Sequence, residues 1–328
     1  MPITNPKRNL NATARFKDTL IMADKIRNLN HGRETYAVYY GNDFVLKRPL
    51  PTFGTDAKDA WLAKQHKTKN AIDSISAIAN PVYNIPKMLF INDEEYQILE
   101  ERAPGVPLTR HLFHQLSRRQ QFEIINSIGS FLVDMNESKP VQDIQKHKIA
   151  EELKFSRLNN FVETKMSTWF TKNEVLQMAQ IRDEIGTFEY ETRMAWSHCD
   201  LNSGNVLYDP ATSTISFIDF AEAGYRFIYR DIFASLQIEL NIYKKVYEIY
   251  TKLHNKSLYS MPNIKNDALR EIMKYRIMVV LLKRFIKAAD DMRLHPSNEK
   301  SIRNNEEKLA FMRAQLGQII DLKRNYSK

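Results

Sequence analysis

Cysteine is nearly absent from this chain of 328 residues, and glycine is scarce. The single cysteine, Cys199, excludes an internal disulfide and a zinc site built on several cysteines, and it fits a reducing compartment. With nine glycines in total, we expect each one to be placed for a backbone reason. Long apolar runs are also missing: the longest, residues 277–282, falls far short of the roughly 20 residues that a membrane-spanning helix needs.

The first residues contain no apolar signal core, so we expect no secretion by a signal peptide and a cytoplasmic location. The net charge is +9, from 48 basic and 39 acidic residues. Residues 263–328 hold fifteen of the basic and eight of the acidic residues, or +7. A basic helical face can bind an anionic partner. Acidic residues are interleaved with the basic ones, which favours an ordinary solvated surface. The composition gives no strong sign of a nucleic-acid partner, and the oligomeric state stays open.

The N-terminal third is β-rich. Residues 35–40 and 43–47 predict two strands around the turn residues Gly41 and Asn42, and 88–91 and 96–99 predict a second hairpin. Between them, 56–79 has helical spacing, with apolar residues that include Ala60, Ile72 and Ile75. The segment 103–107 contains two prolines and a glycine and predicts a domain boundary. We therefore expect a small first domain, residues 1–102, in which 1–28 form an arm or a helix.

The remainder, residues 103–328, predicts a larger and mostly helical domain. Residues 117–137 carry apolar side chains at helical spacing, from Phe122 to Met135. Residues 143–185, interrupted near 168–171, and the chain from about 230 onward also predict helices. One short β-hairpin, 206–208 with 215–218, lies inside this helical region.

The clearest chemical pattern directly precedes and follows that hairpin. His198, Asp200 and Asn205 form a His-x-Asp-x-x-x-x-Asn pattern, and Asp219 lies 219 − 200 = 19 residues after Asp200. Phosphoryl transfer needs a carboxylate to orient the acceptor hydroxyl and oxygen ligands for Mg²⁺, and these residues supply both. Aspartate and asparagine also populate ordinary turns, which is the alternative reading. The placement of Asp219 directly after an apolar strand favours the phosphoryl-transfer reading.

A cation that neutralises phosphate is also needed, and Lys47 ends a predicted strand where it could serve. A lysine in that place is more often a solvated edge residue. Lys47 alone therefore indicates little, and its significance depends on the other residues.

Together these residues resemble the protein-kinase-like small-molecule phosphotransferases, the aminoglycoside phosphotransferase and choline kinase superfamily. The resemblance rests on 198–208, 218–224 and 229–231, with support from 99–108, which is similar to the family's hinge. It implies an α+β, bilobal protein-kinase-like fold with a small β-rich N-lobe and a large, mostly helical C-lobe. It further implies ATP, with GTP possible, Mg²⁺, and a small-molecule acceptor that carries a hydroxyl.

The same resemblance implies the role of each residue. Asp200 is the catalytic base, and Asn205 and Asp219 are Mg²⁺ ligands. Lys47 contacts the α- and β-phosphates, and the backbone from Glu101 to Ala103 meets adenine. His198 and Asp231 support the catalytic loop.

Departures from the family pattern bear on the other functions that the sequence could support. The expected phosphate-covering loop has one glycine, Gly32, and no segment resembles a protein kinase's activation segment. The helix after Lys47 has no glutamate to pair with it, and Asp59 and Gln65 are the nearest candidates. The basic surface leaves an atypical protein Ser/Thr kinase as one alternative, although the missing activation segment opposes it. The missing glutamate leaves a non-catalytic nucleotide-binding scaffold as the other.

Two further expectations concern the acceptor and the metal. Basic residues of the last helices, Lys283, Arg284 and Lys287, disfavour a polycationic acceptor and leave sugars, nucleosides and anionic acceptors. Glu222 lies three residues after Asp219 and could be a second carboxylate near the metal, but we expect it to face solvent.

Overall fold

The computed structural model describes most of the chain between residues 30 and 254. The described residues are 30–31, 35–40, 43–78, 80–148, scattered positions from 171 to 183, 189–254, and positions 310, 314 and 317. The chain forms two compact units, each made from two stretches of sequence. The first joins Met1–Leu108 to Gly204–Ala223, and the second joins Thr109–Ser203 to Gly224–Lys328. The predicted arm, 1–28, and nearly all of the basic segment, 263–328, that was predicted to be helical lie outside the described residues. The contiguous division after residue 102 stays a prediction.

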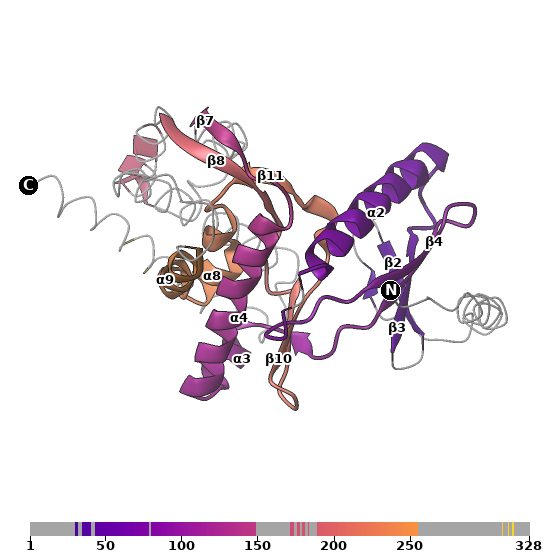
Figure 1. Ribbon diagram of the computed structural model, residues 1–328, viewed down its shortest axis with the longest axis horizontal. Helices are drawn as coiled ribbons and strands as arrows, with labels where there is room; N and C mark the ends of the chain where they lie inside the picture. Colours follow the sequence, from indigo (N-terminus) through magenta and orange to yellow (C-terminus); the bar gives the residue numbers. More distant parts are fainter. Residues whose placement is uncertain are drawn as a thin grey trace, which may run out of the picture. The chain divides into compact units, whose positions relative to one another are not determined.

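An antiparallel sheet of five strands and one long helix make up much of the first unit (Figure 1). The strand order is β1-β2-β3-β5-β4, so the two hairpins meet where β3 pairs with β5. Both predicted hairpins are therefore confirmed, although the turn residues Gly41 and Asn42 lie outside the described part. The elements are β1 (Asn30–His31), β2 (Thr35–Tyr40), β3 (Phe44–Pro49), α2 (Thr55–Ser76), β4 (Met88–Asn92) and β5 (Gln97–Glu101).

Helix α2 buries one face, and Trp61 anchors that face to the sheet. The Trp61 indole Nε1 donates a hydrogen bond to Thr35 Oγ1 of β2 at 3.0 Å. Ile72 and Ile75 are buried as their spacing predicts, whereas Ala60 is exposed because it lies beside the buried stripe. The stripe contains no charged residue: its members are Trp61, Gln65, Thr68, Ala71, Ile72 and Ile75.

A second sheet in the same unit joins its two stretches of sequence. The order is β10-β9-β6, where β6 is Val106–Pro107, β9 is Val206–Asp209 and β10 is Thr214–Phe217. On the other side of the hairpin, Asn84 N donates to Ile215 O at 2.7 Å and Asn84 O accepts from Phe217 N at 3.0 Å. The predicted hairpin at 206–218 is confirmed, and backbone hydrogen bonds tie both of its strands to the first stretch of the chain.

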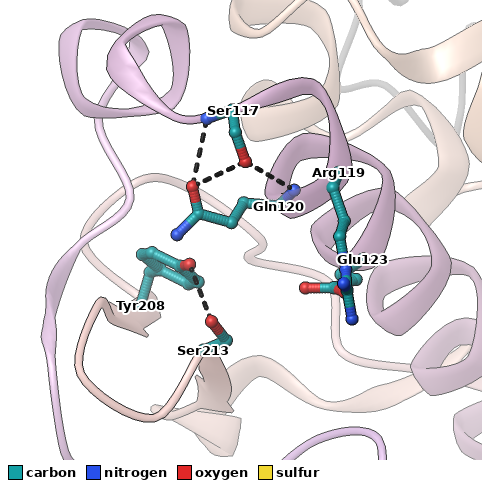
Figure 2. A network of polar contacts seen from close by, with 6 residues as sticks. All are labelled: Ser117, Arg119, Gln120, Glu123, Tyr208 and Ser213. Carbon is teal, nitrogen blue, oxygen red and sulfur yellow. Dashed lines mark hydrogen bonds and ion pairs between the residues drawn. The ribbon is translucent and has the colours of Figure 1, made fainter.

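Gly105 lies against the backbone of this hairpin. Its φ is +96°, and a Cβ there would lie 2.4 Å from the carbonyl carbon of Tyr208. Only glycine fits so close an approach without a backbone shift. The Tyr208 hydroxyl lies 3.5 Å from Ser213 Oγ in the hairpin turn (Figure 2).

The second unit combines helices with a three-stranded antiparallel sheet, in the order β11-β8-β7. Helices α4 and α9 pack closely at Gly129, where a side chain would not fit: a Cβ there would lie 2.5 Å from Ile249 Cγ2. The elements are α3 (Arg110–Gln115), α4 (Arg118–Glu137), β7 (Gln142–Lys148), β8 (Glu189–Ser197), β11 (Gly224–Phe227), the 3₁₀ turn η3 (Asp231–Phe233), α8 (Ser235–Glu239) and α9 (Tyr243–His254).

Helix α4 begins where its sequence predicts, at a capping box. Ser117 Oγ accepts from Gln120 N at 3.3 Å, and Gln120 Oε1 accepts from Ser117 N at 3.0 Å (Figure 2). Ile125, Ile128 and other apolar residues of the predicted face are buried. Phe122 is the exception, since 64% of its surface is exposed.

The sheet of the second unit corrects a sequence expectation. Residues 143–148 were expected to be helical but form most of strand β7, which pairs with β8. Strand β8 itself was not predicted. Both strands are polar along much of their length. Paired residues of β7 and β8 are about 45 positions apart in the sequence, and those of β8 and β11 about 30, so the local sequence pattern does not reveal the pairing. Among the residues that the structure describes, no helix has the length and apolar character to cross a bilayer.

Candidate functional site

Lys47 lies on β3 and forms an ion pair with Glu100 of β5. The distance from Lys47 Nζ to Glu100 Oε1 is 2.6 Å, and the two side chains are 24% and 12% exposed. The sequence left the partner of Lys47 open, with Asp59 and Gln65 of the helix as the nearest candidates, and the structure gives Glu100 instead. Asp59 accepts a hydrogen bond from the Tyr96 hydroxyl at 2.6 Å, and the sheet supplies the carboxylate for Lys47.

The surroundings of Lys47 raise its pKa above the ordinary value of 10.5. Burial opposes this by disfavouring the charged amine, but the charge of Glu100, its hydrogen bond and the charge of Asp219 together outweigh burial. Lys47 is therefore a permanent cation at neutral pH. The effect of Asp219 on this pKa also means that the Asp219 carboxylate is near enough to Lys47 for their charges to interact.

Asn205 and Asp219 lie at the open end of the β9–β10 hairpin. Val206 pairs with Phe217 as the last pair of the ladder, and Ile218 N donates to Asn205 O at 3.0 Å just beyond it. Asn205 is buried and Asp219 is exposed. Asp219 has φ 62° and ψ 69°, a left-handed conformation, and the 3₁₀ turn η2 (Phe220–Glu222) begins directly after it. Two residues with side-chain oxygens, Asn205 and Asp219, therefore lie at one end of the hairpin.

These donors fit a magnesium ion that binds together with phosphate. Within the described ranges, no three His, Cys, Asp or Glu side chains form a cluster that could hold a metal by themselves. Mg²⁺ is usually bound by one or two carboxylates, with phosphates and water completing the shell. Asp219 and the amide oxygen of Asn205 match that smaller requirement.

Glu222 is not part of this donor set. Its Oε1 lies 3.1 Å from Lys64 Nζ of α2, and its side chain is 59% exposed. The expectation that Glu222 faces solvent is confirmed. The ion pair connects helix α2 to the turn that follows Asp219.

The segment expected to meet adenine leaves one main-chain donor available. Glu101 N donates to Lys87 O at 2.9 Å, and Arg102 N donates to Asp43 O at 2.7 Å. Across the described part of the chain, no hydrogen bond takes up the N–H of the next residue, Ala103. Ala103 is only partly buried, so its N–H is able to bind a ligand.

The loop that contains Asp200 belongs to the second unit, and the buried carboxylate of Asp231 holds its start. Asp231 Oδ2 accepts from His198 N at 2.6 Å, and both carboxylate oxygens lie 3.2 Å from Cys199 N. Asp231 is 4% exposed. Cys199 has φ 71°, which is unfavourable for a residue with a Cβ, so these bonds hold a strained backbone in place.

Asp200 is exposed, and its backbone is held by its neighbours. Asp200 N donates to His198 Nδ1 at 3.3 Å, which makes Nδ1 the acceptor nitrogen of this imidazole. His198 is fully buried, and its ring lies edge-on to Phe131. Asn202 Nδ2 donates to Asp200 O at 3.3 Å. The arrangement fixes the main chain on both sides of a solvent-accessible carboxylate.

The described contacts thus place Lys47, Glu100 and Asp219 in one electrostatic group of the first unit. Asn205 lies at the same end of the β9–β10 hairpin as Asp219. His198, Asp200 and Asp231 form one hydrogen-bonded group of the second unit. Glu100 is the residue that sequence reasoning missed. An antiparallel pairing of 44–47 with 98–101 would have placed its side chain diagonally from Lys47, on the same face.

Comparisons with known proteins give the family and the fold. A family model described as "Phosphotransferase enzyme family" matches residues 25–246. No curated protein sequence matches the chain.

Solved structures give the fold. The GDP complex of aminoglycoside 2'-phosphotransferase-IIIa has a TM-score of 0.58 at 13% identity, and the match covers 92% of this chain and 98% of that one. Macrolide 2'-phosphotransferase type I has a TM-score of 0.52 at 15% identity, with 96% and 99% covered. A choline/ethanolamine kinase family protein from Mesorhizobium loti has a TM-score of 0.54 at 13% identity, with 94% and 98% covered.

These likenesses confirm the predicted α+β fold of the kinase-like phosphotransferases. The family match covers more than half of the sequence, and it includes Lys47, Glu100, the loop that contains Asp200, and Asp231. The chain therefore belongs to the phosphotransferase enzyme family.

Proposed function

We propose that the protein transfers the terminal phosphoryl group of a nucleoside triphosphate to a hydroxyl of a small molecule. ATP is the first candidate donor and GTP the second, with Mg²⁺ as the metal. The observation that carries this proposal is the charge pattern of the first unit. A paired, partly buried ammonium, Lys47, interacts with Asp219, which stands with Asn205 at the end of one hairpin. Alternating positive and negative groups are what a metal-bound polyphosphate requires.

In this proposal the nucleotide is held mainly by the first unit. Lys47 neutralises the α- and β-phosphates, and Ala103 N–H donates to the adenine ring beside Glu101. Asn205 and Asp219 hold Mg²⁺, which when bound offsets the negative charge of the phosphates. The residues themselves fix the phosphates' position and reduce the repulsion that an approaching hydroxyl would meet.

Asp200 is the proposed general base. Its exposed carboxylate orients the acceptor hydroxyl and takes its proton as the new phosphate ester forms. His198 and Asp231 hold the main chain of Asp200 and do not touch the reacting atoms. They are positioning residues.

The acceptor is proposed as a class only: a small molecule that bears an alcohol group. Proteins with this fold include an aminoglycoside and a macrolide phosphotransferase and a choline/ethanolamine kinase family member. Sugars, nucleosides and amino alcohols are therefore screened beside kanamycin and a macrolide. Competition by polyamines against competition by polyanions separates cationic from anionic acceptors.

The first experiment is the melting temperature of the protein with Mg²⁺ and ATP, with Mg²⁺ and GTP, or with Mg²⁺ alone. A ligand at 100 times its Kd stabilises the folded state by about 2.7 kcal/mol, which gives a clear rise. The acceptor panel is then tested with the preferred nucleotide by following the nucleoside diphosphate released.

Variants separate catalysis from ordinary turn chemistry. Asp200→Ala is expected to abolish transfer and to keep the nucleotide-dependent rise in melting temperature. Asp209→Asn is the control, because Asp209 is a turn aspartate of the β9–β10 hairpin, whose carboxylate accepts from Ala211 N and Thr212 Oγ1. Its activity should stay near that of the wild type. Equal activity of the Asp200→Ala variant and the wild type would refute the assignment of the base.

A further inference from the structure

The carboxylate that pairs with Lys47 comes from the neighbouring strand β5 and not from helix α2. A partly buried ammonium needs a carboxylate partner, because burying an unpaired charge is strongly unfavourable. The buried face of α2 has no acidic residue. The acidic residues elsewhere on this helix include Asp59 and Asp73, which bind Tyr96 and Lys69 respectively.

The charge on α2 near the metal-binding turn has the opposite sign. Lys64 of this helix pairs with Glu222, three residues after Asp219. The helix therefore binds the turn through its own lysine, and it offers no carboxylate to the lysine of the sheet. Two separate ion pairs, Lys64–Glu222 and Lys47–Glu100, stabilise this part of the first unit.

The strand register explains why Glu100 can be the partner. Lys47 is opposite Ile98, and Val45 is opposite Glu100, in the antiparallel pairing of β3 and β5. Residues two apart on a strand share a face, so Lys47 and Glu100 are diagonal neighbours on one face of the sheet. Their 2.6 Å contact is a charge-assisted hydrogen bond between two strands whose backbone is fixed by the ladder.

We infer that Glu100 positions Lys47 for the phosphates of the nucleotide, in place of a carboxylate from the helix. This inference rests on the proposed function and goes beyond it by assigning a role to Glu100, which the proposed function leaves without one. Because both partners stand on paired strands of one sheet, the ammonium keeps its place without any contribution from α2. Less side-chain freedom is then lost when the nucleotide binds.

The test is a double-mutant cycle on nucleotide binding and on turnover. The variants are Glu100→Gln, Lys47→Ala, both together, and Glu100→Asp, with Asp73→Asn as a control that breaks an exposed ion pair in the same unit. Affinity for Mg²⁺ with a non-hydrolysable ATP analogue is measured by calorimetry, and kcat and KM by steady-state kinetics. Melting temperatures establish that each variant is folded.

We expect Glu100→Gln to weaken nucleotide binding and raise KM about 10-fold or more, since a misplaced contact group is costly. Glu100→Asp, which keeps the charge, should restore part of that loss. In the Lys47→Ala background, Glu100→Gln should add no further loss, because the group that it positions is already gone. A purely structural defect would lower the amount of active protein, and hence the apparent kcat, without raising KM.

Three outcomes overturn the inference or its basis, and they can be told apart. Absence of nucleotide binding by the wild-type protein refutes the proposed function itself. Normal binding by the wild type together with unchanged KM in Glu100→Gln refutes the role of Glu100 alone. Fully additive losses in the double variant show that Glu100 acts independently of Lys47, which also refutes it.

Discussion

Replacing Asp231 by alanine should be among the most damaging single changes in the described part of the chain. The carboxylate accepts from two successive backbone N–H groups, those of His198 and Cys199, and it is 4% exposed. A hydrogen bond to a charged acceptor contributes about 1.5–3 kcal/mol. Alanine removes the acceptor of two such bonds, so the free energy of unfolding should fall by roughly 3–6 kcal/mol. Water has little access to these groups and cannot easily replace the carboxylate.

Asparagine at the same position gives a smaller and more informative change. Asp231→Asn keeps one oxygen acceptor and removes the charge, so it should cost roughly half as much as alanine, about 1.5–3 kcal/mol. Because the loop that carries Asp200 begins at these two N–H groups, kcat should also fall by about 10²-fold through misplacement of the base. The KM for the nucleotide should change little, since Lys47 and Ala103, which are proposed to hold the nucleotide, are untouched.

Urea unfolding, followed by circular dichroism, measures the stability of both variants, and steady-state transfer measures kcat and KM. Asp73→Asn, which removes an exposed carboxylate from an i,i+4 pair, should change stability by less than about 0.5 kcal/mol. If Asp231→Ala does not fold, the asparagine variant still decides the matter. A loss below about 1 kcal/mol for Asp231→Ala, with an unchanged denaturant slope, would refute the account of this carboxylate as the support of the loop.

Three further predictions concern stability. Gly105→Ala should cost at least about 2 kcal/mol in urea unfolding, because of its positive φ and a 2.4 Å approach to Tyr208. Gly54→Ala, where a Cβ meets nothing within 4 Å, should cost less than about 1 kcal/mol; equal losses would contradict the steric argument. Tyr250→Phe should cost about 1–3 kcal/mol, since the buried hydroxyl donates to Asn136 Oδ1 at 2.6 Å; a neutral result would mean that water replaces the hydroxyl. Burial raises the pKa of Tyr250 well above 10.0, so the stability that its neutral form contributes is present below pH 10 and is lost as pH rises further. Absorbance at 295 nm should then show its ionisation only as near-UV circular dichroism disappears, and ionisation near pH 10 in the folded protein would contradict this.

Several elements could be predicted because the information for them is local. The hairpin of β9 and β10 follows from short apolar strands around an Asp-Pro turn, and α4 follows from helical spacing after Ser117. The pattern from His198 to Asp219 resembles the family because the proposed phosphoryl transfer calls for such residue types close together in the sequence. None of this depends on contacts between distant segments.

The missed features depend on such contacts. Strand β7 pairs with β8 across a long intervening segment, and its polar sequence has no apolar alternation that would distinguish it from a helix. Phe122 fits the helical period but lies at the edge of the buried stripe of α4, where the rest of the unit does not cover it. Glu100 was missed because a strand's partner and register decide which side chains meet.

Two of the five non-glycine residues with positive φ in the described part of the chain lie where the chemistry is proposed; the other three are Tyr96, Ser213 and Asn241. Cys199 and Asp219 both have positive φ, at 71° and 62°, and they lie beside or at the proposed base and metal ligand. Such a conformation costs an L-residue about 1–2 kcal/mol, so it persists only where other contacts enforce it. At Cys199 the enforcing group is Asp231, whose two backbone hydrogen bonds can offset more than that strain. At Asp219, the short turn that follows begins with the fully buried Phe220, and burial of that ring stabilises the strained conformation. The strain is consistent with loops shaped to present Asp200 and Asp219 to a substrate.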